Sequence, residues 1–343
     1  MNRKLLLVAM ITAVMSMATL DVGHAQQPYQ GSRIRMIVSY NPGGGYDLYS
    51  RVIARHLPRH IPGNPSVIVQ NMPGGGSVIG ANYLYRIAPR DGTAVGIFSP
   101  TRVLSQVIGV PGFEFESEKF NWLAAGNISD VLTCFATSAA GVKTLDDAVK
   151  RKNPLIVGTT GAGSTTHTWA RAYKEILGAN FKVVSGYPGS AGIRAAMERG
   201  ELEAGCGVQW SSMRATAGDL IESGKAVIFS QIGIAKSKEF PHLENALDRA
   251  KTDLDREVLS ALLTENRIGR AYAAPPGVPE DRVGILRKAF LETLRDPKLV
   301  AEASKAGIDV DPLPGEEVQK VVSELKEISP AAKKKVLNFL EQP

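Results

Sequence analysis

The pattern of apolar and polar positions repeats one unit of strand, turn and helix four times along the chain. In each unit, a short apolar run predicts a strand, and apolar positions at a spacing of three and four residues then predict a helix. The predicted strands span residues 35–40, 66–70, 155–158 and 181–184. Units of this kind in series favour a parallel sheet with helical crossovers.

The turns between these strands and helices are rich in glycine. The first two contain the tetrapeptide Pro-Gly-Gly-Gly, at residues 42–45 and 73–76. Asp47 follows the first tetrapeptide and is predicted to be the N-cap of its helix, because its carboxylate can accept a free backbone N–H. All four turns follow the carboxyl ends of strands, where the ligand-binding loops of such sheets lie.

The four units come in two pairs separated by other material, which predicts two α/β domains that share one cleft. Domain 1 is expected to be discontinuous, with residues 26–130 and 234–343, and domain 2 to span residues 131–233. The tail contains a predicted amphipathic helix over residues 283–294 and a helical stretch over 318–340, interrupted at Pro330.

Residues 1–25 have the layout of a secretory signal peptide. Arg3 and Lys4 precede an apolar run over residues 5–20, and Gly23 and Ala25 place small residues before a cleavage site. The apolar run is shorter than the ~20 residues that span a membrane comfortably, so a retained anchor is the less favoured alternative. We therefore expect the mature chain to be exported.

Composition narrows the class of protein further. The 343 residues are 44% hydrophobic and 22% charged, which excludes a disordered tail protein and is typical of globular domains. The net charge of +6 is spread along the chain without a basic block, so a nucleic-acid partner is not expected. Export allows the two cysteines, Cys134 and Cys206, to form a disulfide, but we favour free buried thiols.

Glycine turns that lead into helices suit an anion. They expose backbone N–H groups, and the helix dipoles add positive potential at the same point. The four turns contain no Arg or Lys, so neutral donors would hold the anion. The alternative is that the glycines only permit tight turns.

Enzyme motifs are largely missing. No G-x-S-x-G elbow occurs, and residues 218–225 do not match a P-loop in spacing. His56 and His60 lack the ligand cluster of a metal site. His167, near Ser164, is the one candidate base. We expect no catalytic residue, no metal and no cofactor, and keep a secreted enzyme that uses His167 and Ser164 on an anionic substrate as an alternative.

Several segments together resemble the Bug family, the extracytoplasmic solute receptors of tripartite tricarboxylate transporters, also described as TctC-like. The first two, with their glycine tetrapeptides, carry most of the resemblance. The segments are Pro42–Asp47 with Arg51, Val69–Gly76, Pro89–Thr93, Gly161–His167, Tyr187–Ala191 and Ala273–Pro279.

The resemblance implies a two-domain periplasmic binding protein of type II-like, Venus-flytrap architecture, each domain a mainly parallel sheet flanked by helices. It also implies that main-chain amides of the first two turns grip a carboxylate while the second domain closes over it. The candidate ligand-binding residues are Gly43, Gly44, Gly45, Tyr46, Asp47, Gly74, Gly75, Gly76, Ser77, Gly163, Ser164, Thr165, Thr166, His167, Tyr187, Gly189, Ser190 and Ala191.

The expected partners are a small organic acid and the membrane permease subunits of the transporter, with the receptor itself a monomer. A di- or tricarboxylate, an aromatic acid or an amino acid would all suit the turns. Tyr46, Trp169, Tyr187 and Trp210 are candidates to line an aromatic pocket, or else belong to the core. A subunit that presents its ligand to a sensor kinase is a further alternative.

Overall fold

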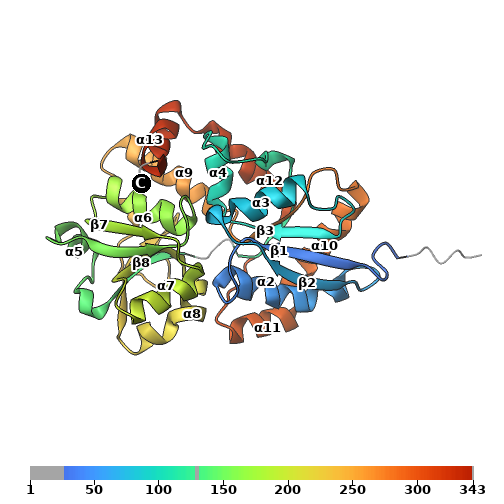
Figure 1. Ribbon diagram of the computed structural model, residues 1–343, viewed down its shortest axis with the longest axis horizontal. Coiled ribbons are helices and arrows are strands. Elements are labelled where there is room, and N and C mark those ends of the chain that lie inside the picture. Colours follow the sequence, from blue (N-terminus) through green and yellow to red (C-terminus); the bar gives the residue numbers. More distant parts are fainter. Residues whose placement is uncertain (1–26, 128–130, 342–343) are drawn as a thin grey trace, which may run out of the picture.

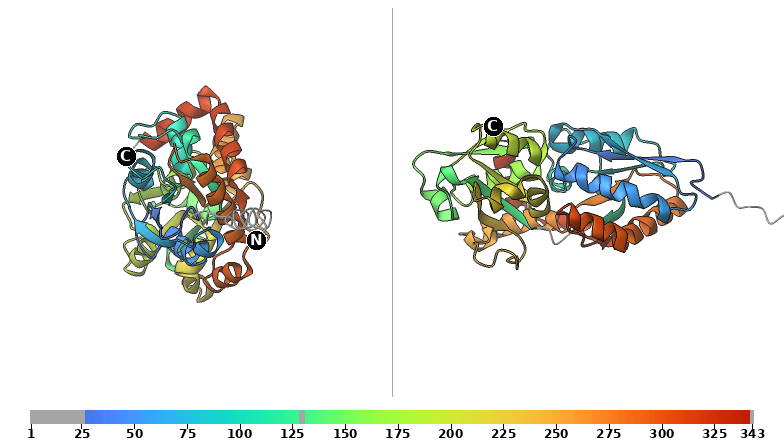
Figure 2. Two further views of the ribbon diagram at one scale, coloured as in Figure 1. Left: turned by 90° about the vertical axis from the view of Figure 1, so that its right-hand side faces the viewer. Right: turned by 90° about the horizontal axis from the view of Figure 1, so that it is seen from below.

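The computed structural model describes residues 27–127 and 131–341, which form two lobes side by side, each built on one β-sheet (Figures 1 and 2). The predicted signal peptide lies outside the described residues, so its cleavage stays a prediction. In the part of the chain that the structure describes, no helix combines the length and apolarity that a membrane span needs.

The first lobe contains a six-stranded sheet in the order β11-β4-β10-β3-β1-β2. β1 runs parallel to β2 and β3, whereas β10 is antiparallel to both of its neighbours, β3 and β4, and β11 is antiparallel to β4. The strands are β1 (Arg33–Val38), β2 (Ser66–Asn71), β3 (Ala94–Ile97), β4 (Asn121–Ala125), β10 (Ala271–Ala274) and β11 (Leu313–Pro314).

The second lobe contains a five-stranded sheet in the order β7-β6-β8-β5-β9. β6 is parallel to β7 and β8, and β5 is antiparallel to β8 and β9. In both sheets, the strand fourth from the β2 or β7 edge is antiparallel, and it is the strand by which the chain enters that lobe from the other. The strands are β5 (Leu132–Thr137), β6 (Leu155–Thr159), β7 (Phe181–Ser185), β8 (Ala204–Gln209) and β9 (Ala226–Ile232). The predicted two-domain α/β fold is confirmed, with β5, β10 and β11 as exceptions to the parallel order.

Helices cover both sheets. Around the first sheet lie α2 (Gly45–His56), α3 (Val78–Arg86), α4 (Thr101–Val107), α10 (Glu280–Arg295), α11 (Pro297–Lys305) and α12 (Gly315–Glu324). Around the second lie α5 (Leu145–Lys150), α6 (Thr165–Glu175), α7 (Gly189–Glu198) and α8 (Trp210–Glu222). Short 3₁₀ turns are η1 (Leu57–His60), η2 (Gly75–Ser77), η3 (Ser117–Lys119), η4 (Ser138–Ala140), η5 (Ala246–Arg249) and η6 (Leu325–Glu327).

Two helices near the C-terminal end extend toward the second lobe. α9 (Asp253–Asn266) contacts α4 of the first lobe, and α13 (Pro330–Glu341) packs on α9 and on α6 of the second lobe, as Figure 1 shows at the top of the molecule. The sheets exchange the chain between residues 125 and 132 and again between 232 and 271. The predicted boundaries at residues 131 and 234 stay a prediction. α13, which was predicted to belong to domain 1, packs on α6 of the second lobe.

The amphipathic pattern over residues 283–294 is confirmed by α10. Val283, Leu286, Phe290 and Leu294 are at most 5% exposed and pack in the core of the first lobe. Full burial of such side chains stabilises a fold by about 1.5–3 kcal/mol each. The predicted interruption at Pro330 is also present, because η6, which follows α12, ends at Glu327 and Pro330 begins α13. Proline fits the first turn of a helix, where no N–H is needed.

The expectation of free thiols is wrong. Cys134 on β5 and Cys206 on β8 form a disulfide between neighbouring antiparallel strands, where the Cα atoms lie 3.9 Å apart. The pairing register shifts between Thr133 and Phe135, which places Cys134 opposite Cys206. The 72-residue separation in sequence does not indicate this pairing, because β5 becomes a neighbour of β8 only through its antiparallel insertion into the second sheet.

Candidate ligand-binding cleft

The four predicted turns meet in a cleft between the lobes. The turns after β1 and β2 approach it from the first lobe, and those after β6 and β7 from the second. Each turn follows the carboxyl end of a parallel strand, so the strand order brings all four to the facing edges of the sheets.

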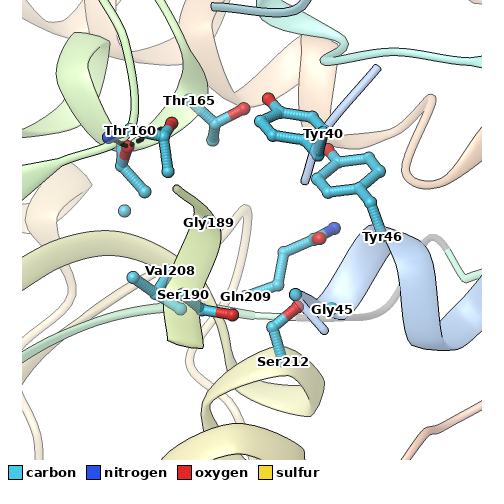
Figure 3. Close-up of a pocket in the computed structure, with 13 residues that line it drawn as sticks. Tyr40, Gly45, Tyr46, Thr160, Thr165, Gly189, Ser190, Val208, Gln209 and Ser212 are labelled. Carbon is cyan, nitrogen blue, oxygen red and sulfur yellow. Dashed lines mark hydrogen bonds between the residues drawn. The ribbon is translucent and has the colours of Figure 1, made fainter. Parts of the chain in front are cut away.

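Two adjoining cavities occupy the cleft, and Tyr40, Thr160 and Gly189 line both. The larger one, of about 340 Å³, is lined by Ser39, Tyr40, Asn41, Pro73, Gly74, Gly75, Gly76, Ser77, Thr160, Gly161, Ala162, Gly186, Tyr187 and Gly189. The smaller one, of about 50 Å³ (Figure 3), is lined by Tyr40, Gly44, Gly45, Tyr46, Thr160, Thr165, Thr166, Gly189, Ser190, Gly207, Val208, Gln209 and Ser212.

The chemistry of the lining is neutral. Among the described residues, neither cavity is lined by a charged side chain. The rings of Tyr40 and Tyr46 stack with centroids 4.5 Å apart, and Gln209 extends into the smaller cavity from the end of β8 (Figure 3). The Ser190 hydroxyl oxygen is buried and has no hydrogen-bond partner among the described residues. A buried hydroxyl without a partner is costly, so a ligand atom that bonds it would be stabilised.

Two-thirds of the candidate residues line these cavities. Those on the lining are Gly44, Gly45, Tyr46, Gly74, Gly75, Gly76, Ser77, Thr165, Thr166, Tyr187, Gly189 and Ser190. Outside the lining are Gly43, Asp47, Gly163, Ser164, His167 and Ala191. Of the four aromatic candidates, Tyr46 and Tyr187 line a cavity, whereas Trp169 is fully buried and Trp210 contacts Phe240 edge-on.

Asp47 is not the N-cap of its helix. α2 begins at Gly45, with Gly44 as the N-cap, and Asp47 lies in the first turn. Its carboxylate accepts hydrogen bonds from the Gly43 N–H, the Arg51 guanidinium and the Asn71 amide, each 2.9 Å long. Burial alone would raise the pKa of Asp47, but these hydrogen bonds outweigh it and hold the pKa below its usual value. Asp47 thus holds the first turn in place through the Gly43 N–H, and the Arg51 guanidinium balances its negative charge.

The second turn is held in left-handed backbone geometry. Gly75 and Gly76 have φ of +56° and +59°, and Ser77, unusually for a residue with a side chain, has φ of +84°. The Ser77 hydroxyl accepts the backbone N–H of Ser99 at 3.0 Å, which anchors this conformation. A Cβ on Gly76 would also lie 2.6 Å from the carbonyl oxygen of Ala162 in the second lobe, so glycine is needed twice over.

His167 and Ser164 have structural tasks in the third turn. The Ser164 hydroxyl caps α6 by accepting the His167 backbone N–H, and His167 Nδ1 accepts the Gly163 N–H at 3.0 Å. Burial, together with the positive charges of Arg171 and Arg102, lowers the pKa of His167 to about 4. A neutral, buried imidazole whose Nδ1 is occupied is poorly suited to act as a general base.

The lobes touch each other across the cleft. A Cβ on Gly44 would lie 3.7 Å from Gly189 Cα, and one on Gly45 would overlap the side chain of Ser212. The Ser99 and Thr165 hydroxyls hydrogen-bond at 2.7 Å between the lobes. The lobes are therefore in direct contact at the cleft, where two glycine-containing turns face each other backbone to backbone.

The sequence pattern did not predict the contribution of the junction between β8 and α8. Gly207, Val208 and Gln209 at the end of β8 and Ser212 in the first turn of α8 line the smaller cavity. α8 begins directly after β8 without a glycine turn, so this junction does not match the repeated unit. Its only available signal was its place after a further strand of the second sheet. Tyr40, at the end of the first predicted strand, was likewise left out of the site although it lines both cavities.

Comparison with known proteins shows similarity over most of the chain. The family model described as the tripartite tricarboxylate transporter family receptor matches residues 50–331. The UPF0065 protein in the gbd 5′ region of Cupriavidus necator is 22% identical over 316 residues, which cover 89% of this chain and 87% of that protein.

Solved structures show the same fold. The periplasmic binding protein BugD superposes with a TM-score of 0.70 at 19% identity, covering 90% of this chain and 97% of that one. MatC from Rhodopseudomonas palustris, solved with bound malate, superposes with a TM-score of 0.66 at 18% identity, covering 86% and 98%.

Proposed function

The chain belongs to the tripartite tricarboxylate transporter receptor family, and we propose that it binds a small organic carboxylate in the interlobe cleft and delivers it to a membrane permease. MatC, which has the same fold, was solved with the dicarboxylate malate. The transport role of the family supports delivery to a permease. Residues 1–25 would direct export, with cleavage near Ala25, and the receptor would act as a monomer in the periplasm.

The observation that carries the proposal is a cleft of backbone donors without a charged lining. Neither α2 nor α7 has a side-chain cap. The Gly189 N–H, the first of α7, donates to the Tyr187 carbonyl oxygen, so under this proposal the later amides of the first turns would meet the ligand. A helix N-terminus typically stabilises an anion by about 0.3–1 kcal/mol at a surface and up to ~2 kcal/mol when partly buried. Neutral donors in the lining hold a carboxylate without a direct ion pair, which suits a ligand that must be released.

The residues that line the cavities divide into two tasks under this proposal. Backbone amides near Gly45, Tyr46 and Gly76 would hold one carboxylate from the first lobe. Hydroxyl and amide groups of the second lobe, with Ser190 and Gln209 foremost, would bond the rest of the ligand. Gly43, Asp47 and the other candidates outside the lining support the turns and would not touch the ligand.

Closure is the step that would signal a bound ligand. The Ser99–Thr165 hydrogen bond and the contact between Gly44 and Gly189 exist only while the lobes are together. A ligand favours closure by as much as it binds the closed form better than the open form. Ligand contacts from both lobes supply that difference, as in other hinge-closing receptors.

A thermal-shift screen tests the proposal. The chain without residues 1–25 is unfolded and refolded to remove carried-over ligand, then heated with mono-, di- and tricarboxylates, aromatic acids and amino acids. Ligand at a hundredfold excess over Kd raises the stability by about 2.7 kcal/mol. At least one acid should raise Tm, and a strain that lacks the protein should lose uptake of that acid. No shift with any acid would refute the proposal.

A further inference from the structure

Arg270 is a buried charged residue at the boundary between the lobes. It immediately precedes β10, the strand by which the chain returns to the first lobe, and it is 1% exposed. Its guanidinium lies over the rings of Tyr46 and Tyr49 on α2, with the Cζ atom 4.9 Å and 5.1 Å from the two ring centroids. Aromatic faces attract a cation, so these rings hold Arg270 in the first lobe.

The same guanidinium bonds the second lobe. Arg270 Nη2 donates to the hydroxyl oxygens of Ser211 and Ser212 in the first turn of α8, at 3.1 Å and 2.5 Å. Hydrogen bonds from a charged donor are roughly twice as strong as neutral ones. Two further interlobe bonds near the cleft, from Ser99 and Thr101, are between neutral groups. Opening the cleft would separate Arg270 from both serines.

The bond to Ser212 also fixes where its hydroxyl proton can go. Arginine has donors only, so the Ser212 oxygen must accept, and its own proton needs another acceptor. Ser212 lines the smaller cavity and is 6% exposed, and its hydroxyl has no hydrogen-bond partner other than Arg270 among the described residues. Figure 3 shows Ser190 and Ser212 in the wall of this one cavity, with the Ser212 hydroxyl oxygen beside Gly45. Two buried hydroxyls of one cavity whose protons lack an acceptor among the described residues indicate a ligand oxygen that accepts from them.

We propose that Arg270 is the positioning residue that links ligand recognition to closure: it joins α2 of the first lobe to α8 of the second and turns the Ser212 hydroxyl toward an oxygen acceptor of the ligand. This proposal rests on the proposed function. It adds that the smaller cavity binds an oxygen acceptor, such as a carboxylate or carbonyl oxygen. Arg270 does not line this cavity, and its positive charge acts on the ligand through the hydrogen bond to Ser212.

The test compares Arg270→Met, Arg270→Lys and Ser212→Ala with the wild-type chain, using whichever acid of the screen shifts its Tm. Each variant is checked for folding by circular dichroism. Arg270→Met should weaken binding of that acid by about 10- to 100-fold, the range for a hydrogen bond to a charged group. Arg270→Lys keeps the charge but cannot reach both serines from the tyrosine rings, so it should lose a smaller factor.

Arg214→Met is the matched control. Arg214 also joins the lobes, through the Gly307 carbonyl and Asp309, but its side chain is one-third exposed and lies outside the cavity lining. Exposed ion pairs contribute little, so its affinity should stay within about threefold of wild type. Equal losses in Arg214→Met and Arg270→Met would overturn the specific role of Arg270.

A double variant separates the proposal from a general loss of packing. If Arg270 acts through Ser212, the loss in Arg270→Met/Ser212→Ala should be clearly smaller than the product of the single losses. Small-angle scattering with saturating acid should show that Arg270→Met stays more open than wild type. Multiplicative losses, or unchanged closure and affinity in Arg270→Met, would overturn the proposal.

A failure of the proposed function would be seen earlier and separately, because wild-type protein would then bind no acid of the screen. In that case the scattering of ligand-free wild type and Arg270→Met still decides the closing role. A more open Arg270→Met would support that role, and an identical radius of gyration would overturn it.

Discussion

Gly45→Ala is expected to prevent full closure while leaving the first lobe intact. Gly45 occupies the first position of α2 and its φ is not left-handed, so alanine fits the local backbone. Alanine also favours a helix over glycine by roughly 0.5–1 kcal/mol. The obstacle is across the cleft, where the new Cβ would lie 2.5 Å from Ser212 Cβ and 3.2 Å from Ser212 Cα, and closer still to the hydroxyl oxygen.

The magnitude follows from this overlap. Carbon atoms approach to about 3.5–4.0 Å, so the lobes would have to separate locally by about 1 Å or more to admit the methyl group. Overpacking of a well-packed contact costs typically 1–3 kcal/mol. Because only the closed form carries this cost, affinity for the ligand should fall by about 5- to 150-fold.

The assay is a calorimetric titration with the acid found by the screen, together with small-angle scattering of the bound form. Ser212→Gly serves as the partner variant, since it leaves only the 3.2 Å approach to Cα, and Gly45→Ala should lose much less in that background. Gly284→Ala on α10, where a Cβ meets nothing within 4 Å, is the control for a neutral substitution. Wild-type affinity and full compaction in Gly45→Ala would refute the closed geometry.

Three further predictions concern stability and are measured by urea or thermal unfolding. Replacing both Cys134 and Cys206 by alanine should cost about 4 kcal/mol in the chain-entropy model for a closed loop of this length, and an unchanged Tm would contradict it. Asp47→Asn should cost about 1–3 kcal/mol at pH 7. Because the native pKa of Asp47 is lowered, that difference should shrink as pH falls through it, and a constant difference down to pH 3 would argue against the mechanism. His167 has a native pKa of about 4, so the unfolded chain binds more protons than the native protein between about pH 6.5 and 4. The free energy of unfolding should therefore decrease as the pH is lowered through that range. His167→Gln should flatten that fall, and an equally steep fall would count against a buried neutral imidazole.

Local signals predicted the parts of the cleft that depend on local chemistry. The turns at residues 42–45 and 73–76 were visible because left-handed backbone geometry at residues such as Gly76 requires glycine wherever it occurs. Parallel strands then brought the turns together without further information.

Long-range features were missed for a common reason. Asp47 is of a residue type that is common at N-caps. Its hydrogen bond to Asn71, 24 residues further along the chain, is a tertiary contact and not part of the helix start. The Cys134–Cys206 disulfide depends on the antiparallel insertion of β5, and Arg270 reaches the cleft only because β10 returns beside β3. Such contacts are made between segments far apart in sequence, so no local pattern carries them.

The most direct test of the central claim, that a carboxylate occupies the cleft and favours closure, is a titration with one acid and its primary amide. The two ligands have nearly the same shape and differ in charge and in hydrogen-bond acceptors. The account predicts that the acid binds and compacts the protein, and that the amide binds about 100-fold more weakly or not at all, because a site of donors is left with an unsuitable partner. Equal affinity for the acid and the amide would contradict it.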